Sequence, residues 1–156
     1  MRIVNWSFAG IALIACLTGC GGTQKVVIDN YRESYSVEVE GVSDAAISDG
    51  LPEGLNVNSV SKNVYNEVIT GLANKGLTKN NNKKSLKVKY NILYFGHKWK
   101  GGFKPEYIIA YNIQLIDTNT GRVIASDKED KDDSELLKVI DDVSDNLVNF
   151  VTDNIK

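Results

Sequence analysis

Few residues in this 156-residue chain are able to do chemistry, and their positions are uneven. There is one His, His97, and the two Cys, Cys16 and Cys20, both lie within the first 20 residues. A zinc site draws its ligands from several His and Cys side chains, and a nucleophile needs a base beside it. His97 lies in a lysine-rich stretch with no carboxylate nearby in the sequence. We therefore predict no metal site, no cofactor and no catalytic site, and expect a protein that is not an enzyme.

Carboxylates are the remaining candidates, and they gather between Asp127 and Asp133, where five of seven residues are Asp or Glu. Lys128 and Lys131 interrupt this stretch, and it lacks the spacing and the glycine of a calcium loop. We expect a solvated acidic turn that leads into a helix. Paired carboxylates could also hydrolyse glycosides, but nothing singles out a pair, so a carboxylate-dependent enzyme stays an alternative.

The composition narrows the class of protein. The chain has 18 Lys and Arg against 20 Asp and Glu, a formal net charge of −2, and 42% apolar residues. These values exclude a collagen, a multi-pass membrane protein, a disulfide scaffold and a strongly basic nucleic-acid binder. With 24% charged residues, the chain also lacks the composition of a disordered tail. A single folded domain remains, and we expect no nucleic-acid partner.

The first 19 residues have the pattern of a targeting signal. Arg2 supplies a positive start, and ten mostly apolar residues follow from Phe8 to Leu17. Spanning a bilayer takes roughly 20 apolar residues, so this run is too short for a stable transmembrane helix. A buried strand or helix with an incidental Cys, and a secretory signal with an ordinary cleavage site, are the alternatives.

The residues Leu17-Thr18-Gly19-Cys20 resemble the lipobox of bacterial lipoproteins, an aliphatic residue and two small ones before Cys. The resemblance implies attachment of lipid to the Cys20 thiol, cleavage between Gly19 and Cys20, and acylation of the new amino terminus with a fatty acid such as palmitate. Because Gly21 is not Asp, resemblance to the sorting pattern of Gram-negative lipoproteins implies transfer to the outer membrane. Two or more acyl chains make a stable membrane anchor.

Cleavage there would divide the chain into three parts. Residues 1–19 would be removed as a signal peptide, residues 20–24 would form a lipidated tether, and residues 25–156 would form a single domain. The mature chain would keep 137 of the 156 residues, and its one Cys would carry lipid, so no disulfide could form within it. A chain of this length can bury enough surface for one core, not two.

Two helices and about five strands are expected in that domain. Strands are predicted at Lys25–Asp29, Ser34–Glu40, Leu86–Tyr94, Tyr107–Leu115 and Arg122–Ser126, mostly from alternating apolar residues. Apolar residues every three or four positions predict helices over Val57–Leu72 and Leu136–Val151, the first followed by Gly76. Asp132, Asp133 and Glu135 are expected at the start of the second helix, where negative charge is favoured.

The turn Asp117–Gly121 joins two strands closely enough to make part of the sheet antiparallel. We predict an α+β fold, a two-layer sandwich in which a mostly antiparallel sheet of about five strands carries two amphipathic helices on one face. The strand from Tyr107, this turn and the final helix resemble the C-terminal half of small bacterial lipoproteins of unknown function. Their fold is similar to that of the curli-secretion lipoprotein, of lipoprotein activators of penicillin-binding proteins, and of the N-terminal domain of the Tol propeller protein.

Charge is segregated along the chain. Nine lysines and no acids lie between Lys75 and Lys104, and nine acids lie between Asp127 and Asp145. One interpretation is that the lysines form the solvent face of a strand beside acids at a helix N-terminus. The other is a dipolar module whose basic side meets an anionic partner.

The best candidate for a partner contact is the segment between the two long strands. It places two aromatic residues among three lysines, a composition that suits protein hot spots. The alternative is that both aromatic residues pack onto the core. The candidate contact residues are Lys98, Trp99, Lys100, Phe103 and Lys104.

Together these features predict a lipid-anchored lipoprotein of the outer membrane, facing the periplasm. Its domain would be a non-catalytic interaction, assembly or accessory module. Its partners would be the membrane, through lipid on Cys20, and an envelope protein or further copies of itself. The alternative function is binding of an envelope polymer or glycolipid, namely peptidoglycan or lipopolysaccharide.

Overall fold

The computed structural model describes residues 35–43, 46–47, 51, 53–77, 84–99 and 105–155. Its four long strands are β1 (Tyr35–Val42), β3 (Lys84–Trp99), β4 (Pro105–Asp117) and β5 (Val123–Asp133). The two helices are α1 (Val57–Asn74) and α2 (Leu136–Asn154), and a two-residue strand, β2 (Ala46–Ile47), lies between β1 and α1 in the chain. The predicted signal, the tether and the predicted strand Lys25–Asp29 lie outside the described residues.

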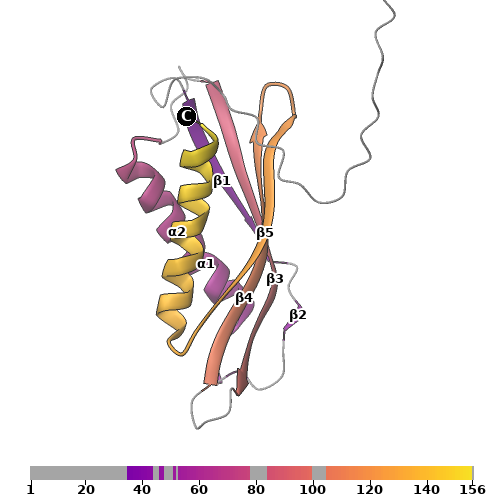
Figure 1. Ribbon diagram of the computed structural model, residues 1–156, viewed down its shortest axis with the longest axis vertical. Helices are drawn as coiled ribbons and strands as arrows, with labels where there is room; N and C mark the ends of the chain where they lie inside the picture. The colour runs from indigo at the N-terminus through magenta and orange to yellow at the C-terminus, as the bar shows by residue number, and fades with distance from the viewer. Residues whose placement is uncertain are drawn as a thin grey trace, which may run out of the picture.

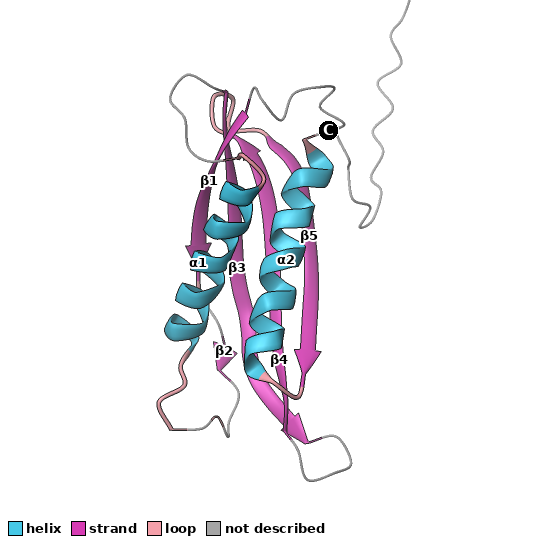
Figure 2. Cartoon of the chain, turned by 90° about the vertical axis from the view of Figure 1, so that its left-hand side faces the viewer, coloured by secondary structure: helices cyan, strands magenta, loops and turns pink. Residues whose placement is uncertain are grey.

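The strands form one sheet in the order β1-β3-β4-β5. The β3–β4 and β4–β5 pairs are antiparallel, whereas β1 runs parallel to β3, and β2 pairs with β3 at Tyr94 and Phe95. Both helices lie side by side on one face of the sheet (Figures 1 and 2). The predicted two-layer α+β fold is confirmed, with four long strands in the described part of the chain.

The first helix forms where its sequence signals predict. Its N-cap is Asn56, whose side chain accepts a hydrogen bond from the backbone N–H of Ser59 at 2.9 Å. The side chain of Ser59 in turn accepts a hydrogen bond from the backbone N–H of Asn56, which completes a capping box. At the other end, Gly76 takes a φ of 74°, which glycine adopts at no steric cost. The N–H groups of Gly76 and Leu77 then bond the carbonyls of Ala73 and Leu72, both at 2.9 Å. These caps provide partners for backbone groups at both ends of α1. The five apolar residues that predicted this helix are all buried.

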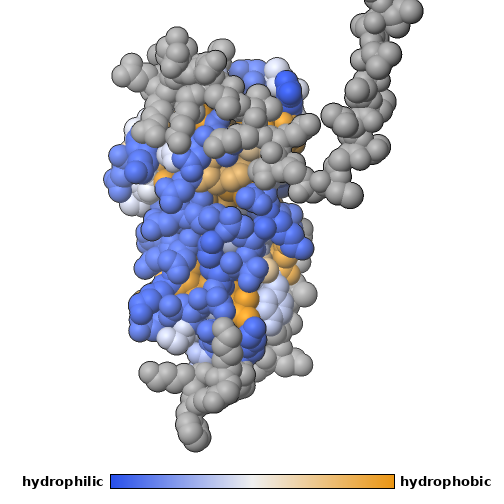
Figure 3. Space-filling model, viewed as in Figure 1, coloured by the Kyte–Doolittle hydropathy of each residue, from blue (hydrophilic) through white to orange (hydrophobic). Residues whose placement is uncertain are grey.

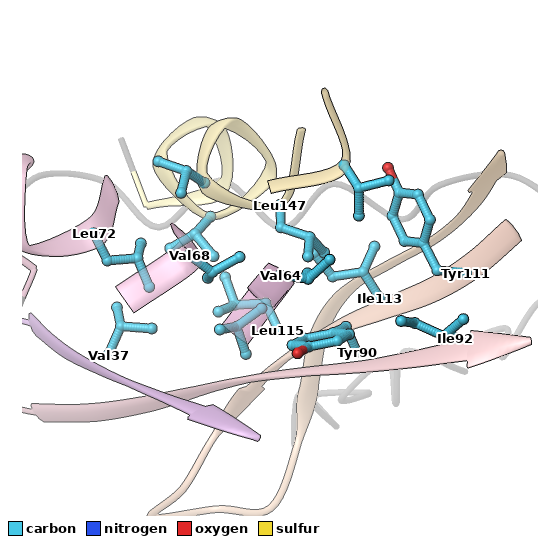
Figure 4. Close-up of a cluster of buried hydrophobic side chains, with 14 of the residues drawn as sticks. Val37, Val64, Val68, Leu72, Tyr90, Ile92, Tyr111, Ile113, Leu115 and Leu147 are labelled. Atoms are coloured by element: carbon cyan, nitrogen blue, oxygen red, sulfur yellow. The ribbon is translucent and has the colours of Figure 1, made fainter. Parts of the chain in front are cut away.

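The core lies between the sheet and the helices, and Figure 4 shows part of it. Residues of β3 and β4 alternate toward the helices, as predicted, and those on the inner face are fully buried except at the hairpin end, where His97 and Tyr107 are half-buried. The two helices also touch each other closely, because a Cβ on Gly71 of α1 would lie only 2.7 Å from Cγ2 of Val148 in α2. The largest fully buried side chains include Tyr90, Tyr111, Phe95, Leu72, Leu86, Ile92, Ile109, Ile113, Leu115 and Leu147.

One strand departs from the predicted alternation. We expected Tyr94 to continue the buried row that ends at Ile92, but the register shifts between these residues. A β-bulge inserts one extra residue, so the side chains beyond it exchange faces. Phe95 is therefore the buried residue, at 0% exposure, and Tyr94 is only half-buried.

The acidic stretch also departs from the prediction. The expected turn at Asp127–Asp133 is wrong, because β5 continues through it and pairs with β4 as far as Tyr107 opposite Asp133. An edge strand tolerates this composition, since one of its faces and its free edge meet solvent. Asp132 and Asp133 consequently end a strand, and α2 begins after Glu135, with no acidic residue in its first turn. Asp133 still caps the junction, because its carboxylate accepts the N–H of Glu135 at 2.9 Å and this bond lowers the pKa of Asp133.

The predicted hairpin turn is confirmed. The carboxylate of Asp117 accepts hydrogen bonds from the N–H groups of Asn119 and Thr120 at 2.8 and 3.2 Å. The N–H of Gly121, whose φ is 68°, donates to the carbonyl of Asp117 at 2.8 Å. An aspartate that bonds its own turn in this way fixes the β4–β5 connection.

Candidate functional site

The end of the β3–β4 hairpin holds what the structure describes of the predicted contact segment. The β3–β4 ladder extends two pairs past the last residue of β5, through Lys98 opposite Glu106 and Trp99 opposite Pro105. This end of the sheet reaches beyond the helix layer (Figures 1 and 2). Lys98 is exposed and lies on the face of the sheet away from the helices. Lys100, Phe103 and Lys104 lie outside the described residues, as does the side chain of Trp99, so the predicted contact stays a prediction.

His97 lies one residue before Lys98 and on the opposite face. Its register partner is Tyr107, two positions before the buried Ile109, so His97 is on the helix side of the sheet. Among the described residues, no group of three or more His, Cys, Asp or Glu side chains could hold a metal ion.

Two lysines that precede the hairpin form ion pairs with one acid on the neighbouring strand. Lys87 and Lys89 of β3 bind the two carboxylate oxygens of Glu40 on β1, at 2.8 and 3.2 Å. These contacts lower the pKa of Glu40, with the hydrogen bond from Lys87 as the larger cause, and raise the pKa of Lys87. Both lysines therefore lie on the solvent face of a strand, as one interpretation expected, but their neighbours are strand residues and no helix N-terminus. Ion pairs that are this exposed contribute little to the stability of the fold.

A polar groove separates β5 from α2. The β5–α2 groove has a volume of about 340 Å³ and is lined by Asp127, Glu129, Asn146, Asn149, Phe150, Asp153 and Asn154. The hydroxyl of the buried Tyr111 donates to Oδ1 of Asn146 at 2.9 Å, and Nδ2 of Asn146 donates to Glu129 at 3.0 Å. Lys131 completes the chain through a 2.6 Å ion pair with Glu129.

This network explains how charged residues can face the helices. Burial of its ring, followed by the negative charges of Glu129, Asp127 and Asp130, raises the pKa of Tyr111 well above its usual value. The phenol therefore stays protonated and supplies the hydrogen that Asn146 accepts. Each polar group in the chain from Tyr111 to Lys131 has a partner, so the network acts as a connection between β4, β5 and α2.

A second groove runs between α1 and the edge strand β1. The β1–α1 groove has a volume of about 250 Å³ and is lined by Val37, Glu38, Val39, Tyr65, Ile69, Leu72 and Leu77. Tyr65 and Ile69 are exposed at 37% and 41%, so apolar surface lies open along this seam. A polar depression of about 280 Å³ continues it past Tyr65, lined by Gly41, Ser43, Asn58, Ser61, Lys62 and Tyr90. The sequence did not predict this groove, because the residues of each wall have the pattern of an ordinary amphipathic strand or helix.

Outside these grooves the described surface is mostly hydrophilic, with small scattered hydrophobic patches in the view of Figure 3. Leu137, at the start of α2, is the most exposed large apolar side chain of the described residues, at 71%. Neither α1 nor α2 is both long and apolar enough to cross a membrane.

The molecule thus belongs to the class of two-layer α+β domains with both helices on one face of a mixed sheet. No protein-family profile matches the chain, and no curated protein matches its sequence. Among solved structures, it is similar to a protein of family DUF330 from Xanthomonas campestris, with 14% identity over 77% of this chain and 81% of that one and a TM-score of 0.49.

Two further solved structures have a related arrangement. The PelC dodecamer from Paraburkholderia phytofirmans is 14% identical over 81% of this chain and 92% of that one, with a TM-score of 0.46. A minor lipoprotein from Acinetobacter baumannii is 13% identical over 74% of this chain and 94% of that one, with a TM-score of 0.45. These likenesses concern the arrangement of strands and helices, and they assign no function.

Proposed function

We propose that the chain is a lipid-anchored lipoprotein of the bacterial envelope whose α+β domain is a non-catalytic interaction or accessory module. The observation that carries the anchor is the run Leu17-Thr18-Gly19-Cys20 directly after a short apolar segment near the start of the chain. Gly21 favours the outer membrane, and the domain would then face the periplasm. The resemblance to the curli-secretion, penicillin-binding-protein-activator and Tol proteins stays a prediction.

The end of the β3–β4 hairpin is the surface that we propose for a protein partner. The strands β3 and β4 reach past the end of β5 there, so side chains in this region can meet a partner without disturbing the core. The segment after Lys98 carries Trp99 and Phe103 among lysines. Aromatic side chains with basic neighbours are frequent binding hot spots, and an acidic rim on the partner would complement them.

In-cell crosslinking of the full chain tests this function. The chain should crosslink to a specific envelope protein, and a Trp99→Ala/Phe103→Ala variant should lose that product while keeping its melting temperature. Leu137→Ala is the control, because it removes an exposed apolar side chain of α2, and it should keep the product. A large fall in melting temperature for the double variant would assign both aromatic residues to the core. Binding to purified peptidoglycan or lipopolysaccharide without any protein product would support the alternative function instead.

A further inference from the structure

The β1–α1 groove begins beside the point where the chain enters the described domain. Tyr35 is the first residue of β1, and Val37, two residues later, lines the groove together with Leu77. The groove is apolar at this end, through Val37, Leu72 and Leu77, and it turns polar beyond Tyr65, where Ser43, Asn58 and Ser61 line the continuing depression. A segment that fits both halves must therefore place apolar residues beside the start of β1 and polar residues farther along the groove.

The backbone of β1 offers hydrogen bonds along the same seam. The sheet order places β1 at an edge, with β3 on its other side. The N–H of Val37 donates to the carbonyl of Leu77 at 3.3 Å, so Val37 directs its backbone groups away from β3. Because strand residues alternate, Val39 and Gly41 direct their N–H and C=O groups the same way. An extended segment lying along the groove beyond Leu77 could bond these groups.

A second copy of the chain is a poor occupant. Pairing of two β1 strands about a two-fold axis would bring Glu38 and Glu40 of one copy near the same carboxylates of the other, which is repulsive. The other sheet edge, β5, carries Asp127, Glu129 and Lys131 on its helix side, and these would be set against the apolar wall of the groove.

The segment that precedes β1 is long enough to reach the groove. Its apolar and polar residues also follow one another in the same order as the two halves of the groove. Counted back from Tyr35, the first run of apolar residues is Val26–Ile28, and the polar residues Lys25, Gln24 and Thr23 follow. Six residues lie between Ile28 and Tyr35, so the two can be roughly 23 Å apart when this stretch is extended, and the chain can pass around Leu77 and return along α1. The order of apolar and then polar residues is the order of the groove.

We propose that the segment Val26–Ile28 of the same chain occupies the apolar half of the β1–α1 groove, against Tyr65 and Ile69. The domain then covers its own exposed apolar seam, residues 23–25 follow along the polar depression, and residues 20–22 are left as the free part of the tether. Docking would also change how far the domain can move from a membrane, and this consequence rests on the proposed lipid anchor. With lipid on Cys20, docking would shorten the free linker from about 15 residues, roughly 50 Å, to about three, roughly 10 Å.

A cysteine scan tests the docking independently of the lipid. In the full chain carrying Cys16→Ala and Cys20→Ser, no native thiol remains, so failure of the lipid anchor cannot affect the result. Cys is introduced singly at Val26, Val27 or Ile28 and combined with Ile69→Cys. The matched control combines each with Leu137→Cys, which is exposed but lies on the other helix. Mild oxidation and peptide mapping then measure disulfides within one chain.

The proposal expects a disulfide within the chain for at least one position paired with Ile69→Cys, and at least tenfold less with Leu137→Cys. Equal yields for the two partners would overturn it, and so would disulfides that form only between chains, which would favour a second copy. As a separate measurement, Val26→Asp combined with Ile28→Asp should lower the melting temperature. An unchanged melting temperature would contradict docking even if the disulfides were inconclusive.

Discussion

Gly71 in α1 lies directly against Val148 in α2, so close that a Cβ on Gly71 would be 2.7 Å from Cγ2 of Val148. This contact sets how near the two helices can lie on the sheet. A glycine in the middle of a helix costs about 1 kcal/mol relative to alanine, so its presence here needs a packing reason. The reason is the space that Val148 fills.

Gly71→Ala should therefore lower the stability of the domain in spite of the better helix propensity of alanine. We expect a net loss of about 1–2 kcal/mol, because overpacking of a core contact outweighs the gain. Denaturant unfolding measures this directly. Val148→Ala alone should also destabilise the domain, and the two changes together should be less harmful than the sum of the single changes. Simple additivity would show that the helices do not meet at this point.

Removal of the Tyr111 hydroxyl should weaken the connection between the sheet and α2. Tyr111→Phe loses the 2.9 Å hydrogen bond to Asn146, and the amide is then left with one partner fewer in the β5–α2 groove. We expect a loss of about 1–2 kcal/mol in unfolding free energy. Tyr65→Phe is the control, since Tyr65 is partly exposed and its change should have little effect. Equal effects would contradict the network.

The same tyrosine predicts a response to alkali. Burial raises the pKa of Tyr111, and of Tyr90, above the ordinary value near 10. A raised phenol pKa in the folded state gives stability that is fully present below the unfolded pKa and is lost as the pH rises above it. Tyr111 and Tyr90 should therefore ionise later than an ordinary phenol in an absorbance titration of the folded protein. If both ionised near pH 10 while the protein stayed folded, these burial assignments would be wrong.

Charges on β5 should protect the edge of the sheet from pairing with other chains. Asp130 and Asp132 are exposed on the solvent face of this strand, and Asp127 and Glu129 occupy the other face. Asp130→Val combined with Asp132→Val should leave the fold intact but cause aggregation, because an uncharged edge strand is open to pairing. Light scattering at rising protein concentration measures this, with Glu67→Val on α1 as the control. Scattering that does not exceed the control would show that the charges have another role.

Much of the fold could be predicted because its signals are local. Helix α1 has both an apolar period and residues that cap its ends, so its extent follows from the sequence alone. The bulge after Ile92 could not be predicted, because it depends on how β3 pairs with β4 and leaves no mark in either strand. The length of β5 was missed for a related reason. Its charged half is held by backbone bonds to β4 and by Asn146 on a distant helix, which no local pattern reveals.

The grooves were beyond sequence reasoning for the same physical reason. Val37 and Ile69 are ordinary apolar positions of a strand and a helix, and only the parallel placement of β1 at the sheet edge leaves a groove between them. The proposed lipid site is the opposite case. It depends on four consecutive residues that end at Cys20, so its prediction needs no knowledge of the fold.

The most direct test of the account is the state of Cys20 in a bacterial cell. The full chain should incorporate radiolabelled palmitate, fractionate with the outer membrane, and yield an amino-terminal peptide that begins at an acylated Cys20. Cys20→Ser should lose the label and leave the membrane fraction, whereas Cys16→Ser should change neither result. A Cys20→Ser protein that still carries the label or still fractionates with membranes would contradict the central claim.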